Sequence, residues 1–243
     1  MGQSLMLRTA SAVAQISAAL FLLHGGSLIA TVPNRIVEFD TSQGSFQVEL
    51  FDSAAPNTVS NFLNYVSSGR YTDSFVHRSI PGFVIQGGGY TFASDAIGLA
   101  SVLADPPIAN EFSLSNLRGT IAMAKLGGNP NSATSQWFVN LVDNVPILDL
   151  QNGGFTVFGK ITGTGMNVID AIAALPRVNA GVPFDTLPVN DYSGGAILKK
   201  NLVVINSVRL IPEPTGILLA TVGALLTLTS TRVCRSRMRP LAP

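Results

Sequence analysis

The sequence predicts a mostly-β domain with about eight strands and two helices. Short runs of alternating apolar and polar residues recur between residues 35 and 211, and turn residues separate them. Two further segments repeat apolar residues at helical spacing. The chain has 243 residues, of which 47% are hydrophobic, and this is enough for one domain with a full core. Because closure removes exposed sheet edges, many short strands favour a closed antiparallel barrel whose ends the helices would cover.

The first predicted elements are a hairpin and a helix. Residues 35–41 and 45–51 alternate apolar and polar side chains on either side of a turn at residues 42–44. Pro56 suits the first turn of a helix, because the missing N–H would have no partner there. The helix is expected to continue to Gly69 through apolar residues at helical spacing, namely Val59, Phe62, Leu63 and Val66.

Six more strands and a second helix complete the predicted domain. A helix over residues 166–175 would carry Val168, Ile169 and Ile172 on one face. The segment 92–110 fits no element, and the sequence assigns it no role. The remaining strands are expected at residues 75–79, 83–86, 119–125, 136–141, 156–162 and 202–210.

The low charge of the chain excludes several classes of function. Charged residues make up 12% of the sequence and the net charge is +1, which argues against nucleic-acid binding. The single cysteine, Cys234, lies outside the predicted domain, and the only histidines are His24 and His77. Disulfides, metal clusters and catalytic triads are therefore hard to assemble, and we expect no metal and no cofactor. Nothing in the sequence indicates an obligate interface, so a monomer is expected.

The N-terminal segment reads as an export signal. Residues 1–30 contain an early cation, Arg8, then an uncharged apolar run, and then small residues that end at Ala30. This order predicts a secretory signal peptide that is cleaved after Ala30. A membrane anchor that stays on the protein is the alternative.

The C-terminal segment resembles a sorting signal. Residues 211–214 read Ile-Pro-Glu-Pro, residues 215–231 carry no charge, and four arginines follow up to Arg239. Positive residues stay on the cytoplasmic side, so such a span would leave the domain outside. The pattern over residues 212–239 is similar to the PEP-CTERM signals of Gram-negative bacteria, which implies processing by an exosortase and transfer to the outer surface or an extracellular matrix. An ordinary tail anchor is the alternative.

The most informative internal segment is residues 75–88, which place one permanent cation among apolar residues. Arg78 lies on the first of two extended runs joined by a Pro-Gly turn. A guanidinium is charged at any ordinary pH and carries five donors, so it suits holding a carbonyl rather than moving a proton. His77 would point to the opposite face of the strand. We therefore expect it to be a hydrogen-bonded structural residue and not an acid or base.

Together with residues 132–139 and 155–160, this segment resembles the cyclophilin family of peptidyl-prolyl isomerases in its bacterial form. The three motifs occur in the order of the family and cover a domain at about residues 35–211. The resemblance implies a closed eight-stranded antiparallel β-barrel capped by two α-helices. It also implies an enzyme that rotates X–Pro peptide bonds, whose partners are proline-containing segments of unfolded or extended proteins.

Site residues follow from the same resemblance. It implies that Arg78 stabilises the twisted amide and that Gln86 helps to orient the arginine and the peptide. The implied substrate-binding residues are Phe83, Val84, Ala124, Lys125, Gln136, Phe138, Ile147, Leu148 and Phe155. Each has a plainer alternative: the apolar residues as core, the two glutamines as structural amides, and Lys125 as a solvated charge. Ile147 and Phe155 stand where drug-sensitive eukaryotic members have tryptophan and histidine, which puts cyclosporin binding in doubt.

Other residues are expected to serve the fold only. The triplet at residues 87–89 lacks the Lys-Ser or Lys-Thr of a phosphate loop, so its glycines indicate backbone freedom at a turn. Lys160, Asp143 and Asp149 fit surface or turn positions.

Three functions are compatible with the sequence. The first is an exported prolyl isomerase that acts on envelope proteins. The second is a module at the cell surface or in the matrix that binds proline segments without turnover. The third is a structural barrel that has lost its function, which the complete set of Arg78, Phe83, Gln86 and Phe138 argues against.

Overall fold

The computed structural model describes residues 34–94 and 98–212 of the chain. The predicted signal peptide and nearly all of the predicted sorting signal lie outside these residues. Within the described ranges, no helix has the length and hydropathy needed to cross a membrane.

The N-terminal hairpin forms as predicted. Strand β1 (Ile36–Thr41) pairs antiparallel with β2 (Gly44–Leu50), and Phe39 lies opposite Phe46. The two rings stack with their centroids 4.7 Å apart in the core. Gly44 begins β2 with φ of 116°, a conformation that L side chains rarely adopt.

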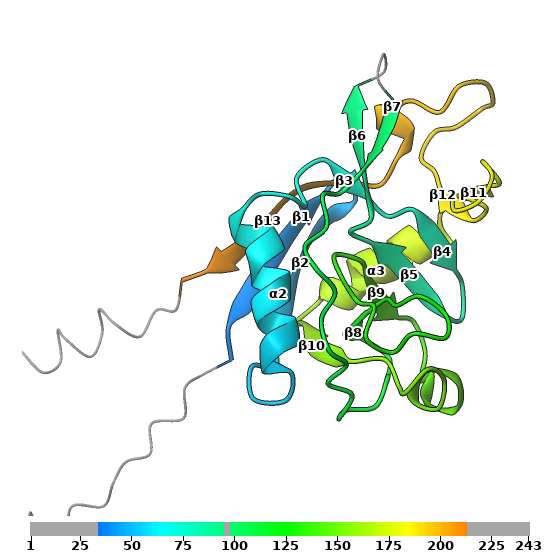
Figure 1. Ribbon diagram of the computed structural model, residues 1–243. Coiled ribbons are helices and arrows are strands. Elements are labelled where there is room, and N and C mark those ends of the chain that lie inside the picture. Colours follow the sequence, from blue (N-terminus) through cyan, green and yellow to red (C-terminus); the bar gives the residue numbers. More distant parts are fainter. Residues whose placement is uncertain (1–33, 95–97, 213–243) are drawn as a thin grey trace, which may run out of the picture. The chain divides into compact units, whose positions relative to one another are not determined.

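Most described strands belong to one antiparallel sheet that curls into a half-barrel (Figure 1). Its order is β4-β5-β9-β8-β10-β2-β1-β13-β3-β6-β7, and β11 and β12 form a separate pair. The bounds are β3 Ser74–Phe75, β4 Arg78–Ile80, β5 Val84–Gly87, β6 Tyr90–Ser94, β7 Gly98–Ser101, β8 Thr120–Met123, β9 Trp137–Asn140, β10 Val157–Thr162, β11 Arg177–Val178, β12 Leu187–Pro188 and β13 Val204–Ile211.

The strand predicted over residues 75–79 is split into β3 and β4, which bond to different neighbours in the sheet. The N–H of Val76 donates to Val203 O at 3.0 Å, whereas the N–H of His77 donates to Gln86 O at 3.0 Å. The segment therefore bonds to the β13 side first and to β5 afterwards. In the recorded order of the sheet, β4 and β7 are the ends, so the closed eight-stranded barrel stays a prediction.

Both predicted helices are present. Helix α2 (Pro56–Ser67) begins at the expected proline and packs against β13. Its first free N–H groups are satisfied from a distant segment, because the N–H groups of Asn57 and Thr58 donate to the carboxylate of Glu111 at 3.1 and 2.7 Å. Helix α3 (Gly165–Ala174) packs against β2 and β10 and buries Ile169 and Ile172.

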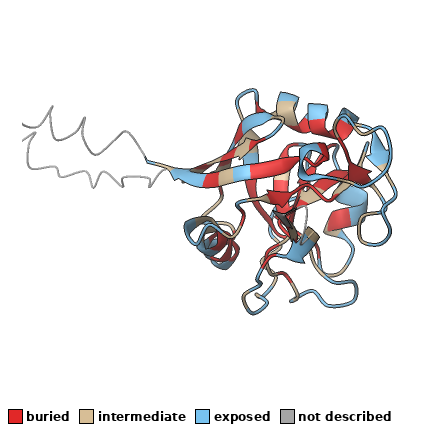
Figure 2. Ribbon diagram, turned by 90° about the horizontal axis from the view of Figure 1, so that it is seen from above, coloured by how far each residue is buried: buried red, intermediate tan, exposed pale blue. Residues whose placement is uncertain are grey.

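Buried residues are frequent along the strands (Figure 2), and the sheet buries apolar side chains on both faces. In β9, Trp137 and Val139 join the main core between the sheet and the helices. Phe138 points to the other face and joins a smaller cluster with Val84 and Leu148. Successive strand residues point to opposite faces, so the main core and the smaller cluster lie on opposite sides of the same strands.

Several elements were not predicted. The segment 92–110 contributes to the β6–β7 hairpin, and a bidentate ion pair then ties it to the end of α2: Arg70 donates to Asp105 at 2.8 and 2.7 Å. A short π-helix, Val145–Asp149, follows β9, and a 3₁₀ turn, Lys199–Asn201, precedes β13. Neither short turn has an apolar period long enough to predict.

Candidate functional site

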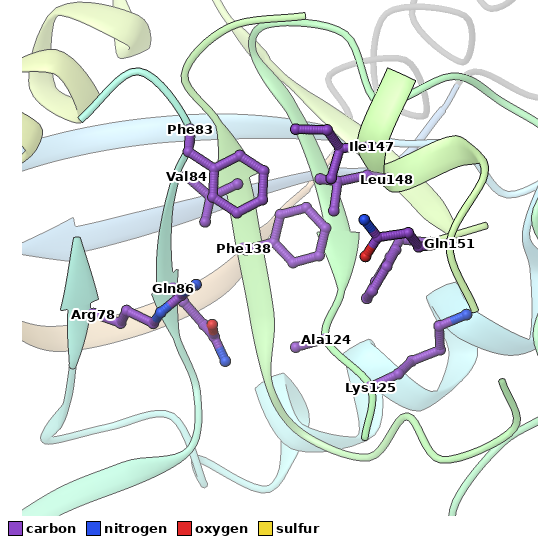
Figure 3. Close-up of a pocket in the computed structure, with 11 residues that line it drawn as sticks. Arg78, Phe83, Val84, Gln86, Ala124, Lys125, Phe138, Ile147, Leu148 and Gln151 are labelled. Carbon is purple, nitrogen blue, oxygen red and sulfur yellow. The ribbon is translucent and has the colours of Figure 1, made fainter. Parts of the chain in front are cut away.

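A pocket of about 240 Å³ opens on the smaller apolar cluster (Figure 3). Strands β4, β5 and β9, the residues directly after β8, the π-helix and the loop that follows it build its walls. Its lining residues are Arg78, Phe83, Val84, Gln86, Ala124, Lys125, Phe138, Ile147, Leu148, Gln151 and Phe155. The structure thus brings together every predicted site residue except Gln136, which lines a second cavity beside the first.

Strand register places the polar end of the pocket beside its apolar floor. Arg78 of β4 lies opposite Gln86 of β5, and Gln86 lies opposite Phe138 of β9. Residues directly opposite in an antiparallel ladder share a face. A single row across three strands therefore carries the cation, the amide and the aromatic ring.

The floor of the pocket is apolar and tightly packed. Phe138, Val84 and Leu148 are buried, and the Phe138 ring meets the Phe155 ring edge-on with the centroids 5.7 Å apart. Ile147 lies at the rim and is 44% exposed. Such a pocket fits a small apolar ring and leaves one wall open to a peptide chain.

Arg78 offers the largest number of free hydrogen-bond donors in the pocket. Its side chain is half-buried, and among the residues that the structure describes it makes no ion pair and no hydrogen bond. All five guanidinium N–H groups are thus available to a ligand. The amide of Gln86 donates instead to Gln136 Oε1 at 2.8 Å, so its predicted part in orienting Arg78 stays a prediction.

Lys125 differs from the alternative of a solvated charge. Its Nζ donates to Asn152 O at 2.9 Å, Gly154 O at 2.6 Å and Asn110 Oδ1 at 3.2 Å. It also lies 4.8 Å from the centroid of the Phe155 ring. Burial lowers the pKa of this ammonium. Lys125 therefore holds the loop that carries one wall of the pocket.

Gln151 is a lining residue that sequence analysis missed. It follows the π-helix in an irregular loop, where no periodicity predicts the direction of a side chain. Only the fold of that loop against the pocket identifies it.

A buried asparagine network supports the apolar wall. The side chain of Asn144 donates to Phe83 O at 3.0 Å and to Asn140 Oδ1 at 2.8 Å, and Asn140 donates to Asn116 Oδ1 at 3.2 Å. Asn116 in turn donates to Asp149 Oδ1 from both its backbone N and its Nδ2, each at 2.9 Å. Asp149 therefore does more than fill a turn: it ends the chain of bonds that fixes the segment carrying Leu148.

The pKa of Asp149 reflects this position. Burial alone would raise it, but the hydrogen bonds from Asn116 outweigh burial and lower the pKa below the ordinary value. The carboxylate is therefore charged at neutral pH and remains an acceptor for both Asn116 donors.

Close packing, and not only turn geometry, explains two of the glycines near the site. A Cβ at Gly88, where φ is 76°, would lie 2.7 Å from Ser135 O and 2.8 Å from the Trp137 ring. A Cβ at Gly154 would lie 2.3 Å from the Phe112 ring. Gly88 adopts its positive φ in the connection between β5 and β6, so the expected backbone freedom at a turn is confirmed. The lack of side chains there also lets the backbone approach the residues around Trp137.

Lys160 and Asp143 lie on the surface, as predicted, and each has a polar partner. Lys160 Nζ lies 3.1 Å from Glu49 Oε2, and the Asp143 carboxylate accepts from the N–H of Arg118 at 2.8 Å. Both residues are exposed and serve local structure, as expected.

His77 is a buried structural residue, as predicted, and it does not line the 240 Å³ pocket. Its ring meets Tyr90 edge-on at 4.9 Å between centroids. The predicted side-chain hydrogen bond is missing at Nδ1, which has no partner among the described residues. Burial, with the nearby charge of Arg78, lowers the pKa of His77 to about 4.

This lowered pKa predicts a specific loss of stability in acid. Between pH 6.5 and about 4 the unfolded chain binds a proton at residue 77 that the folded chain does not, so the free energy of unfolding falls as pH falls. The contribution is on the order of 3 kcal/mol across this range. Denaturant unfolding of the wild type and of His77→Phe at a series of pH values measures it. The wild type should show the steeper fall, and parallel curves would contradict the assignment.

Comparisons with known proteins agree with this geometry. Residues 36–193 match the family described as cyclophilin type peptidyl-prolyl cis-trans isomerase/CLD. A peptidyl-prolyl cis-trans isomerase of Acinetobacter baylyi is 40% identical over 166 residues, which cover 66% of this chain and 85% of that protein. Peptidyl-prolyl cis-trans isomerase B of Escherichia coli is 39% identical over 156 residues, which cover 62% and 91%.

The fold is also similar to a solved structure. A cyclophilin-type isomerase of Cryptosporidium parvum superposes with a TM-score of 0.56 at 24% identity, over 74% of this chain and 99% of that one. The family match spans most of the chain and includes the whole row from Arg78 to Phe138. The chain therefore belongs to the cyclophilin-type peptidyl-prolyl cis-trans isomerase family.

Proposed function

We propose that this protein catalyses cis–trans rotation of X–Pro bonds in exported proteins, with Arg78 stabilising the twisted amide. One observation carries the proposal: a guanidinium that has no side-chain partner among residues 34–94 and 98–212 stands in register with an apolar pocket of suitable size for a proline ring. The named isomerases among its relatives support the activity. A cyclophilin of the same fold was crystallised in the presence of the dipeptide Ala-Pro, which supports a proline-containing ligand.

The reaction asks little of the protein beyond binding and electrostatics. The barrier to rotation is about 18–20 kcal/mol because the amide must lose its resonance, whereas the cis and trans forms of X–Pro differ by only about 0.5–1 kcal/mol. No bond is broken and no proton has to move. A site that binds the twisted form more tightly than either planar form is therefore sufficient.

The residues of the pocket divide this work. Phe138, Val84 and Leu148 would hold the proline ring, so that the peptide can turn about a fixed ring. Arg78 would donate to the prolyl carbonyl and place positive charge near the nitrogen as its lone pair leaves conjugation. Gln86 and Gln136 are hydrogen-bonded to each other beside Arg78, and they offer polar atoms for the backbone of the bound peptide. Because Arg78 is half-buried, the low dielectric around it strengthens the electrostatic interaction of its guanidinium with the substrate.

The absence of a titrating group in this mechanism is itself a prediction. The proposed mechanism moves no proton, so kcat/KM should stay flat between about pH 6 and pH 8. Rates of peptide isomerisation measured in this range test the prediction. A bell-shaped profile would show that an acid or base takes part.

A non-catalytic module that binds proline segments is the second candidate, and the open rim around Ile147 favours peptide binding in either case. NMR exchange spectroscopy on an X–Pro peptide separates the two functions. An enzyme raises the exchange rate between the cis and trans signals at substoichiometric concentration. A binding module shifts the signals without faster exchange.

The location of the protein is a further part of the proposal. The apolar N-terminal run and the Pro-Glu-Pro, apolar and arginine pattern at the C-terminus support export, followed by transfer to the outer surface or matrix of a Gram-negative bacterium. We propose the export machinery and an exosortase as partners in this route. Intact-mass measurement of the protein from its native cells should show loss of both terminal segments. A mass equal to the full sequence would contradict the proposed processing.

A further inference from the structure

The two cations that line the pocket differ from most others in the described part of the chain. Carboxylate ion pairs engage six Arg or Lys side chains there, namely Arg35, Arg70, Arg118, Lys160, Lys199 and Arg209. Arg78 and Lys125, which both line the pocket, are not among them. Within the described ranges, no carboxylate therefore neutralises the positive charge at the site.

The same two cations line a second cavity of about 390 Å³ beside the first. The cavities share Gln86 and Ala124 as well, so one surface continues from one to the other. The other lining residues are neutral or apolar, and neither cavity has an aspartate or glutamate in its wall. A chain that passes from the pocket across this surface would meet only positive and neutral groups.

The bonds of Lys125 preserve its charge instead of cancelling it. Its three acceptors are two backbone carbonyls and one amide oxygen, all neutral. They hold the ammonium in place at the wall, which lowers the entropic cost of using it for a ligand. A fixed cation in a partly dehydrated groove attracts an anion more strongly than a mobile surface lysine does.

We propose that the site selects X–Pro segments that carry an acidic side chain within two residues of the proline. This inference rests on the proposed function, because it assumes that the proline ring occupies the apolar pocket. An extended chain rises about 3.3 Å per residue, so the side chain of a residue one or two positions away from the ring reaches the surface shared by the two cavities. The positive charges of Arg78 and Lys125, which have no competing carboxylate in the described part of the protein, then attract the ligand carboxylate through their combined field.

Matched peptides test the preference. In two blocked series, Xaa-Ala-Pro-Ala and Ala-Ala-Pro-Xaa, Xaa is Glu, Gln or Lys, and both kcat/KM and Kd are measured for the full-length protein. At about 0.02 M salt, we expect Glu to exceed Gln about three- to tenfold in at least one series, and Lys to be the poorest. At about 0.5 M salt the ratio should approach one. Equal values for Glu and Gln in both series at low salt would overturn the proposal.

Variants at two lysines show whether the preference for an acidic side chain arises at the site. Lys125→Gln should reduce the Glu-to-Gln ratio at least twofold, whereas Lys200→Gln removes the same charge from an exposed lysine that forms no recorded ion pair and should leave the ratio unchanged. Equal reduction by both variants would show a general charge effect and refute a site preference. Lys125→Arg should retain the ratio. If Lys125→Gln does not fold, the salt dependence of the wild type decides.

The outcomes separate this inference from the proposed function. If no peptide is isomerised, the enzymatic proposal fails, but the Kd values still report whether acidic peptides bind more tightly. If all peptides are isomerised at the same rate and bind equally, the enzymatic proposal stands and the charge preference is wrong.

Discussion

Arg78→Ala is expected to lower kcat/KM for prolyl isomerisation by about 100-fold or more. The variant removes the guanidinium that lines the apolar pocket, and among the described residues no other cation shares its row across β4, β5 and β9. The loss should fall mainly on kcat, because the interaction is strongest in the twisted state. Exchange spectroscopy or a coupled peptide assay measures both constants.

The fold should survive this change. Arg78 is half-buried and makes no recorded bond to another described side chain, so the free energy of unfolding should change by less than about 0.5 kcal/mol. Arg78→Lys is a second variant that keeps the charge but loses the planar guanidinium group. Its activity should lie between those of the wild type and Arg78→Ala. Wild-type activity in the alanine variant, with its unfolding midpoint unchanged, would remove Arg78 from the mechanism.

Asp149→Ala should cost about 3 kcal/mol of stability and also raise KM. The carboxylate accepts two hydrogen bonds from Asn116, which is fully buried, and charged acceptors contribute about 1.5–3 kcal/mol each. Without it, the N–H and Nδ2 of Asn116 lose a partner in the interior. The segment that carries Leu148 then loses its anchor, and the wall of the pocket loosens.

Denaturant unfolding and Michaelis–Menten constants measure the two effects separately. Asp149→Asn retains one acceptor oxygen and should lose less stability than the alanine variant. Asp185→Ala is a control at an exposed aspartate with no recorded side-chain hydrogen bond, and it should change neither quantity. If Asp149→Ala matched this control in stability and in KM, the asparagine network would have no role in shaping the pocket.

Secondary structure was predictable where side chains repeat over a sufficient length. The hairpin with Phe39 and Phe46, helix α2 from Pro56 and helix α3 around Ile169 all form at their predicted places. The β6–β7 hairpin and the π-helix at Val145–Asp149 were missed. Each is too short for a period of apolar residues to predict it, and contacts from distant segments, such as Arg70 with Asp105 beyond β7, hold the neighbouring chain in place.

The residues of the candidate site, like the secondary structure, were predictable only in part. Ten of its eleven lining residues were predicted from the family resemblance, and a resemblance indicates which residues recur without recording which bonds they make. Lys125 was therefore identified as a site residue, although its alternative as a solvated charge proved wrong. Gln151 belongs to no motif and was not identified at all.

The order of residues along the chain was enough to predict a β-rich domain, two helices and the residues that gather at one pocket, because periodicity and motif content are local properties of the sequence. Only the tertiary structure decided that Arg78 and Lys125 have no acidic partner in the part of the chain that it describes, and that Asp149 anchors the wall behind Leu148. Partner choice depends on which side chains meet in space. Asn116 meets Asp149 from 33 positions away and Arg70 meets Asp105 from 35 positions away. All four residues lie outside the strands, so the packing of the connecting segments, and not proximity in the sequence, determines these meetings.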